Sequence, residues 1–193
     1  MKCDIVLCGV GGQGILSIAA VIDRVAMDAG LELKQAEVHG MAQRGGAVQS
    51  HLRLADRPIS SDIIPRGAAD LLLSVEPMEA LRYLDFLAPE AAVVSSASPF
   101  VNIPDYPKIE EVLESLRRVE KHVLLDTRAL AKEAGNVRSE NTVVLGAASP
   151  FLPLPADALQ SAMMEAFASK GEAIVQVNRK AFDLGRDAAL ARS

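Results

Sequence analysis

Short apolar runs alternate with helical periodicity along most of this chain. Residues 3–8 form a short apolar run that ends at a glycine, which predicts a buried strand. Residues 14–29 then repeat apolar positions every three or four residues, which predicts a helix, and Gly30 suits its end. Residues 31–40 predict a second strand, and the glycine-containing segment 40–46 predicts a loop.

A different pattern follows the loop. From Ala47 the residues alternate, with Val48, Leu52 and Leu54 on one face and Gln49, His51 and Arg53 on the other. This alternation predicts a half-exposed strand. Residues 55–58 predict a turn, and residues 59–64 are expected to return beside the strand. The pattern therefore predicts a hairpin inserted into the alternation of strands and helices.

The rest of the chain returns to alternating strands and helices. Strands are expected at 70–77, 91–98 and 122–127, and helices from Pro77 and over 109–116, 129–134, 141–148, 159–167 and the tail from about 177. Three prolines in residues 99–107 predict a loop. We expect an α/β protein with three layers, a mostly parallel sheet with helices on both faces and a hairpin insertion, all in one domain over residues 1–193.

Composition and charge narrow the functional classes. Half of the residues are hydrophobic, Trp is absent and aromatics make up 4%, so the core must consist mainly of Ala, Val, Leu and Ile. The formal net charge of −5 argues against a nucleic-acid-binding surface. The N-terminal residues lack the pattern of a signal peptide, and no apolar run is long enough to span a bilayer. These features predict a cytoplasmic protein with no membrane partner.

The two cysteines, Cys3 and Cys8, both lie in the first apolar run. Five residues apart on a strand, they are expected to point to opposite faces, so they cannot pair locally. Two thiols are also too few for a four-cysteine iron–sulfur cluster. We expect both to be buried as small hydrophobic residues.

A glycine-rich segment separates the first strand from the first helix. Gly9, Gly11 and Gly14 form the pattern G-x-G-x-x-G, which is found where a dinucleotide binds a βαβ unit. That interpretation also needs an acidic residue at the end of the second strand. Glu37 is a candidate, although it lies slightly further along the chain than the usual position of that acid. Two alternatives remain open: the glycines allow close packing of helix and sheet, or they contact an anion or cofactor at a subunit interface.

A second polar cluster follows the second strand, in the sequence HGMAQRGG. Ligands collect at the carboxyl edge of parallel sheets, where this segment, the glycine-rich segment and the end of the strand 70–77 are expected to meet. The candidate residues there are Gln13, His39, Gly40, Gln43, Arg44, Gly45, Gly46 and Glu76. Three of these residues also have simpler interpretations when each is taken alone. His39 can be a surface histidine, Arg44 can pair with a surface acid, and Glu76 can cap a helix. Together they predict a site or an interface.

Several catalytic signatures are missing from the sequence. No Walker lysine follows the glycine-rich segment, so it is not a P-loop. No HxxxH or CxxC spacing indicates a metal, and G-x-S-x-G is absent. The sequence offers no complete catalytic set.

Four segments in order resemble a known family. GVGGQGIL, EVHGMAQRGGAVQSHLR, ADLLLSVEPMEALRYL and NTVVLGA are similar to the gamma domain of the 2-oxoacid:ferredoxin oxidoreductases. The form HGMAQRGG is most similar to small (beta) subunits of indolepyruvate ferredoxin oxidoreductases, whereas pyruvate and 2-oxoglutarate members carry a Tyr-Gly-x-x-x-Arg-Gly-Gly form. The resemblance covers residues 3 to about 187 and implies the fold of domain III of pyruvate-ferredoxin oxidoreductase.

The resemblance also implies an activity and partners. The reaction would be oxidative decarboxylation of a 2-oxoacid to an acyl-CoA, with electrons passed to ferredoxin. Thiamine diphosphate, Mg and 4Fe-4S clusters would lie in a large alpha subunit, with coenzyme A as cosubstrate, and this chain alone would bind no cofactor and be inactive. The residues implied to face that partner near its active site are Gly9, Gly11, Gly12, Gln13, Gly14, His39, Gly40, Gln43, Arg44, Gly45 and Gly46.

Three alternatives to this function remain open on the sequence. The chain can be the gamma subunit of a pyruvate or 2-oxoglutarate oxidoreductase. It can be a free-standing protein that binds NAD or FAD. It can also be a scaffold or regulatory module whose glycine loop is purely structural.

Overall fold

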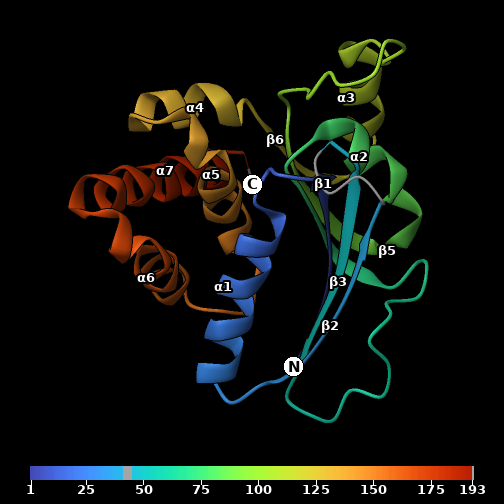
Figure 1. Ribbon diagram of the computed structural model, residues 1–193. Coiled ribbons are helices and arrows are strands. Elements are labelled where there is room, and N and C mark those ends of the chain that lie inside the picture. Colours follow the sequence, from blue (N-terminus) through green and yellow to red (C-terminus); the bar gives the residue numbers. More distant parts are fainter. Residues whose placement is uncertain (41–44, 193) are drawn as a thin grey trace.

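The computed structural model describes residues 1–40 and 45–192, apart from the side chain of His39 (Figure 1). Its strands and α-helices are β1 (Lys2–Val10), α1 (Ile15–Asp28), β2 (Glu32–His39), β3 (Ala47–Ala55), β4 (Ala69–Ser74), α2 (Pro77–Arg82), β5 (Leu87–Ser96), α3 (Ile109–Arg117), β6 (Lys121–Leu125), α4 (Thr127–Ala134), α5 (Glu140–Ala148), α6 (Ala156–Phe167) and α7 (Glu172–Leu190). Short 3₁₀ helices are η1 (Leu84–Phe86), η2 (Val137–Ser139), η3 (Ser149–Phe151) and η4 (Ala168–Lys170).

The strands form one sheet in the order β2-β3-β1-β4-β5-β6. The neighbours β1, β4, β5 and β6 pair in parallel, whereas β3 pairs antiparallel with both β1 and β2. In Figure 1, α1 and α4–α7 lie on one side of the sheet, and α2 and α3 lie on the other. The predicted α/β fold, with three layers and a mostly parallel sheet, is confirmed.

The first strand shows why the sheet has two cores. Cys3, Ile5 and Leu7 of β1 belong to the apolar cluster shared with α1, α5, α6 and α7. Val6 and Cys8 point to the other face and join the cluster shared with α2 and α3. Because both faces of a parallel sheet are covered, β1 is continuously apolar from Ile5 to Cys8 rather than alternating. Both cysteines are buried on opposite faces, as predicted, and burial raises the pKa of the two thiols.

The predicted hairpin between the strand from Ala47 and residues 59–64 is wrong. β3 already pairs with β1 on one edge and β2 on the other, so no edge remains for a further strand. The segment 59–64 instead bonds to side chains of β3: the Arg53 guanidinium donates to the carbonyls of Ser61 and Ile63, at 3.0 and 3.2 Å. The inserted hairpin is therefore the one formed by β2 and β3.

The expectation that β3 is half exposed is also wrong. His51, on the face predicted to be polar and open, is only 4% exposed. Its Nδ1 atom accepts a hydrogen bond of 3.1 Å from the Ile64 amide, and its ring contacts Phe86 edge-on at 5.3 Å. The segment after β3 thus covers this face, which local alternation does not reveal.

The helices agree closely with the predicted periodicity. The predicted inner face of α1 is buried, with Val21 added to it. The apolar positions Met78, Leu81 and Leu84 predict that the helix from Pro77 continues to Leu84, but α2 ends at Arg82 and η1 follows it. The tail helix α7 begins at Glu172 and packs on α5 of the same chain, where Gly146 and Gly185 allow close contact of the two backbones.

Candidate functional site

The glycine loop, residues 9–14, leads from the carboxyl end of β1 into α1, as predicted. Gly14 forms the N-cap of α1 with a φ of 82°, a left-handed conformation that favours glycine. A Cβ atom at Gly9 would lie 2.4 Å from Cγ2 of Val75, so a side chain has no room there. These two glycines are therefore required for the close approach of β1, β4 and α1.

Gln13 points inward, toward the backbone of the neighbouring strands. Its Oε1 atom accepts a hydrogen bond of 2.8 Å from the Val10 amide, and its Nε2 atom donates to the carbonyl of Val75 at 3.4 Å. The side chain thus joins the ends of β1 and β4 and shapes the loop from within. Gln13 is half-buried, and its expected place facing a partner stays a prediction.

The glycine loop is paired with the end of the β2–β3 loop. The Gly11 amide donates to the carbonyl of Gly46 at 2.8 Å, and the Gly45 amide donates to the carbonyl of Gly11 at 3.2 Å. Gly40 donates to the carbonyl of Ala47 at 3.2 Å and closes the hairpin. The structure thus brings the two predicted glycine clusters together, although they are about thirty residues apart in the sequence. Gln43 and Arg44, and the side chain of His39, lie outside the described residues.

Glu76, the third predicted contributor, is completely buried at the end of β4. One carboxylate oxygen, Oε2, caps α2 by accepting from the Glu79 amide at 2.8 Å. The other, Oε1, accepts from the Tyr106 hydroxyl at 2.5 Å and from the Phe100 amide at 3.2 Å. Glu76 is thus an N-cap, the simpler interpretation, and it also anchors the loop of residues 97–108.

That anchored loop reaches back to the glycine loop. The Asn102 Nδ2 atom donates to the carbonyl of Gly45 at 2.6 Å. Glu76, Tyr106 and Asn102 therefore form a chain of contacts from the end of β4 to the paired glycines. The sequence predicted a loop at 99–107 from its prolines but gave no signal for these contacts, because loop residues have no periodicity that indicates their partners.

A second carboxyl group lies beside Glu76. Burial raises the pKa of Glu79, and Arg82, whose Nε atom lies 3.2 Å from Oε1, partly offsets this effect. The Oε2 atom of Glu79 has no hydrogen-bond partner among the described residues. Burial and the hydrogen bond to Glu76 both raise the pKa of the Tyr106 hydroxyl, so that hydroxyl stays a donor at neutral pH.

Large exposed apolar side chains lie on the segments next to the paired glycines. Val101 is 67% exposed, and Phe100 and Ile103 on the same loop are 44% and 37% exposed. Leu16, two residues after Gly14, is 43% exposed. Exposed apolar residues that gather beside a structured loop are typical of a protein–protein interface. We call these four residues the apolar rim.

The topology argues against a dinucleotide site. In the dinucleotide-binding fold, the acid that holds the ribose follows the strand next to β1. Here β3 lies between β1 and β2, and Glu37 belongs to β2 at the outer edge of the sheet. The structure therefore keeps Glu37 away from the position that this chemistry requires.

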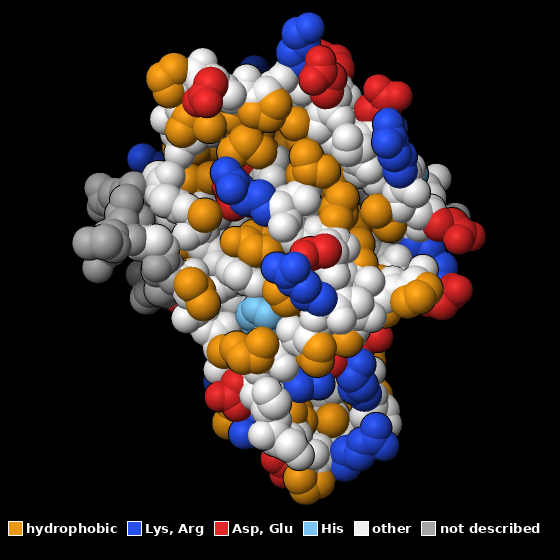
Figure 2. Space-filling model, turned by 90° about the vertical axis from the view of Figure 1, so that its right-hand side faces the viewer, with side chains coloured by type: hydrophobic (Ala, Val, Ile, Leu, Met, Phe, Trp, Pro, Cys, Tyr) orange, Lys and Arg blue, Asp and Glu red, His pale blue; other side chains and the backbone are white. Residues whose placement is uncertain are grey.

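The described residues contain no group of three His, Cys, Asp or Glu side chains placed to hold a metal ion. The two buried cysteines on opposite faces do not fit an iron–sulfur cluster. In the same part of the chain, no helix has the length and apolar character needed to cross a membrane. On the face shown in Figure 2, cationic and anionic side chains are intermingled with hydrophobic ones rather than gathered into a basic patch.

Comparison with known proteins gives consistent matches over nearly the whole chain. Residues 4–188 match the family model described as pyruvate ferredoxin/flavodoxin oxidoreductase. The chain is 37% identical to the indolepyruvate oxidoreductase subunit IorB of Archaeoglobus fulgidus, over 98% of this chain and 96% of that protein. It is 26% identical to the common gamma subunit of the pyruvate/ketoisovalerate oxidoreductases of Pyrococcus abyssi, over 91% and 92%.

Solved structures share the fold. The keto/oxoacid ferredoxin oxidoreductase gamma subunit of Geobacter sulfurreducens superposes with a TM-score of 0.72, at 24% identity, over 98% of this chain and 99% of that one. The 2-oxoglutarate:ferredoxin oxidoreductase of Magnetococcus marinus, solved with 2-oxoglutarate, coenzyme A and succinyl-CoA bound, gives a TM-score of 0.78 at 24% identity. That match covers 98% of this chain but 31% of the larger one, so the chain corresponds to about a third of it.

Proposed function

The chain belongs to the pyruvate ferredoxin/flavodoxin oxidoreductase family, as a small subunit of a 2-oxoacid:ferredoxin oxidoreductase, and we propose that its complex acts on indolepyruvate or a related aryl pyruvate. In the reaction, a 2-oxoacid and coenzyme A yield an acyl-CoA, carbon dioxide, one proton and two electrons. The electrons pass to ferredoxin. The thioester forms as the bond between the carboxylate and the carbonyl carbon breaks.

One observation carries the role of this chain. Its carboxyl edge is tightly organised, with the glycine loop, the β2–β3 hairpin and the loop 97–108 joined through Gly11, Gly45 and Asn102. Yet the residues placed there bond to one another, and the apolar rim remains exposed. An ordered, exposed surface whose described residues include no complete catalytic set supports a subunit that completes a site on another chain.

The cofactors of the reaction belong, in this proposal, to a large alpha subunit. Thiamine diphosphate with Mg would supply the decarboxylation chemistry, and 4Fe-4S clusters would carry electrons. In this proposal the contribution of this chain is to bind, orient and exclude water. We propose that the apolar rim packs against the alpha subunit and that the glycine loops then face its active site.

Charge also has a proposed role at this edge. The N-terminus of α1, a helix of 14 residues, directs its first N–H groups and its dipole toward the glycine loop. Coenzyme A and the 2-oxoacid are both anionic, and a helix N-terminus attracts such groups. By its resemblance, Arg44 would add a guanidinium that binds a carboxylate or phosphate.

The choice of substrate is supported by the relatives. The IorB subunits of Archaeoglobus fulgidus and Pyrococcus horikoshii are 37% and 38% identical to the chain, whereas the common gamma subunit of Pyrococcus abyssi is 26% identical. The HGMAQRGG segment also has the form expected of indolepyruvate members. A role as gamma subunit for pyruvate or 2-oxoglutarate remains the alternative.

A reconstituted complex tests this substrate. The chain would be co-expressed anaerobically with the alpha subunit from the same genome, and ferredoxin reduction would be followed with indolepyruvate, pyruvate and 2-oxoglutarate in the presence of coenzyme A. We expect the highest kcat/KM with indolepyruvate. A higher kcat/KM with pyruvate or 2-oxoglutarate would replace the proposed substrate while leaving the subunit role in place.

A further inference from the structure

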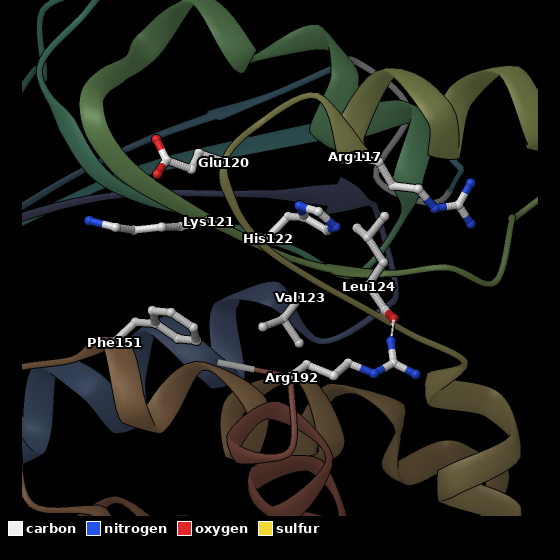
Figure 3. A pocket seen from close by; sticks show the side chains of 8 residues that line it. All are labelled: Arg117, Glu120, Lys121, His122, Val123, Leu124, Phe151 and Arg192. Atoms are coloured by element: carbon white, nitrogen blue, oxygen red, sulfur yellow. Dashed lines mark hydrogen bonds between the residues drawn. The ribbon is translucent and has the colours of Figure 1, made fainter.

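A groove of 620 Å³ runs along β6, at the opposite edge of the sheet from β2. Val123 and Leu124 of β6 and Phe151 of η3 line it with apolar atoms. Figure 3 shows Phe151 and Arg192 across the groove from the strand. Its volume is within the range of sites that bind ligands. It lies away from the glycine loop, because that loop follows β1, and the strands β4 and β5 lie between β1 and β6 in the sheet.

The floor of the groove is the open edge of the sheet. The carbonyl of Leu125 accepts from the Ala97 amide at 2.7 Å, so the backbone groups of Leu125 face β5. Since successive residues of a strand direct their backbone groups to opposite sides, His122 and Leu124 direct theirs into the groove. Within the described residues, these outward groups have one partner: the guanidinium of Arg192, which donates to the carbonyl of Leu124 (Figure 3).

Arg192 therefore occupies the place of a missing strand. It supplies one donor to the carbonyl that a seventh strand would bond, while the amides of His122 and Leu124 still point into the groove. A small anion can accept from those amides but cannot donate to the carbonyls. An extended peptide offers both donors and acceptors and matches such an edge.

The charge of the groove indicates the chemistry of that peptide. The groove is lined by three cations, Arg117, Lys121 and Arg192, and by one acid, Glu120, on a chain whose net charge is −5. Lys121 already pairs with Glu90 at 3.2 Å, whereas Arg117 and Arg192 have no ion pair among the described residues. The cations would oppose their own copies if two chains paired through β6, which argues against a homodimer at this edge. They complement an acidic segment.

We propose that β6 binds an extended segment of a different protein chain, with alternating acidic and apolar residues, as a seventh strand of the sheet. The backbone of the segment would pair with His122 and Leu124. Its acids would meet Arg117 on the side of the sheet that α3 covers, and its apolar side chains would cover Val123 and Phe151 on the other side. Because the groove lies at the edge away from the β2–β3 hairpin, this binding does not depend on the proposed function.

The test uses the ¹⁵N-labelled full chain and the blocked peptide acetyl-Glu-Val-Asp-Val-Glu-Val-Asp-amide. We expect amide exchange of His122 and Leu124 to slow on peptide binding. Exchange at Val123 and Leu125, whose backbone groups face β5, is expected to change little. A peptide with lysines in place of the acids, and one with proline in place of the central valine, are expected to bind at least about tenfold more weakly.

Charge reversal on the protein provides the matched control. The variant R117E is expected to weaken binding of the acidic peptide about tenfold or more. The variant R128E, at an exposed position of α4, has the same change of charge and is expected to bind as the unmodified chain does. The proposal is overturned if the acidic peptide does not bind, if the lysine or proline peptide binds equally well, or if exchange at His122 and Leu124 is unchanged.

Discussion

At the scale of single residues, Glu76 connects several segments of the carboxyl edge through hydrogen bonds. Its carboxylate accepts hydrogen bonds from Glu79, Phe100 and Tyr106, and it is completely buried. A glutamine has nearly the same shape but presents an NH₂ group in place of one oxygen. Both oxygens of Glu76 accept hydrogen bonds, so in either orientation of the amide its NH₂ group would face a donor. A buried hydrogen bond would therefore be lost.

The substitution Glu76→Gln is therefore expected to lower the free energy of unfolding by about 1–3 kcal/mol. Urea unfolding followed by circular dichroism measures this change. Glu114→Gln, at an exposed position of α3, is the matched control and is expected to have an effect within about 0.5 kcal/mol. Equal stability of both variants would show that Glu76 does not anchor the loop 97–108.

Arg44 allows a separate test of function. If its guanidinium contributes positive charge near the partner's active site, Arg44→Ala should lower kcat/KM of the reconstituted complex by about tenfold to a hundredfold, as loss of one charge-assisted contact does. The thermal midpoint of the isolated chain should stay the same. Steady-state kinetics and a melting curve measure the two effects, and unchanged kinetics would contradict this role for Arg44.

Asp23 makes stability depend on pH. Burial raises its pKa to about 6, and its Oδ1 atom has no hydrogen-bond partner among the described residues. Because the folded protein then binds the proton more tightly than the unfolded chain does, the contribution of Asp23 to stability is fully present below about pH 4. It should fall as pH rises through about 6.

Asp23→Asn is expected to remove this pH dependence. At pH 7 it should raise the free energy of unfolding by about 1 kcal/mol, since partial contact with water reduces the cost of the charge. At pH 4 it should change little. Urea titrations at both pH values measure this, with the exposed Asp105→Asn as control; an equal effect at pH 4 and pH 7 would exclude titration of Asp23 as the cause.

At the scale of elements, glycines allow the helices α5 and α7 to pack closely against each other. In the crossing of α5 and α7, a Cβ atom at Gly146 would lie 2.1 Å from the carbonyl oxygen of Phe182, and one at Gly185 would lie 2.0 Å from that of Val143. These positions have no room for a methyl group unless the two helices separate. Alanine normally stabilises a helix relative to glycine, so the two effects oppose each other here.

Gly146→Ala is expected to lower the free energy of unfolding by about 3 kcal/mol or more, because the clash outweighs the gain in helix propensity of about 1 kcal/mol. Gly67→Ala is a useful comparison, since its added Cβ would meet nothing within 4 Å and only its positive φ opposes the change. Thermal unfolding compares the two. A Gly146→Ala variant as stable as the unmodified chain would contradict the close helix crossing.

The elements also show which parts of the fold can be predicted from sequence. α1 and β4 were predictable because their apolar positions repeat within the element itself. The place of β3 between β1 and β2 depends on partners up to fifty residues away, which local alternation does not encode. For the same reason the sequence indicated Glu76 and the glycines, but not their contacts with Tyr106 and Asn102.

On the scale of the whole molecule, one sheet carries two surfaces of different character. The carboxyl edge presents the paired glycine loops and the apolar rim, and the β6 edge presents a cationic groove. We propose that the first surface meets the alpha subunit. We also propose that this chain functions only when it is assembled with that larger partner.

The most direct measurement is an anaerobic pull-down of the tagged chain from its native cell, with mass spectrometry and an absorbance spectrum of the recovered material. The account predicts a large protein that binds thiamine diphosphate and shows iron–sulfur absorbance. The same experiment with Val101→Asp, which places a charge in the apolar rim, should recover much less of it. A colourless chain recovered without a partner would contradict the account.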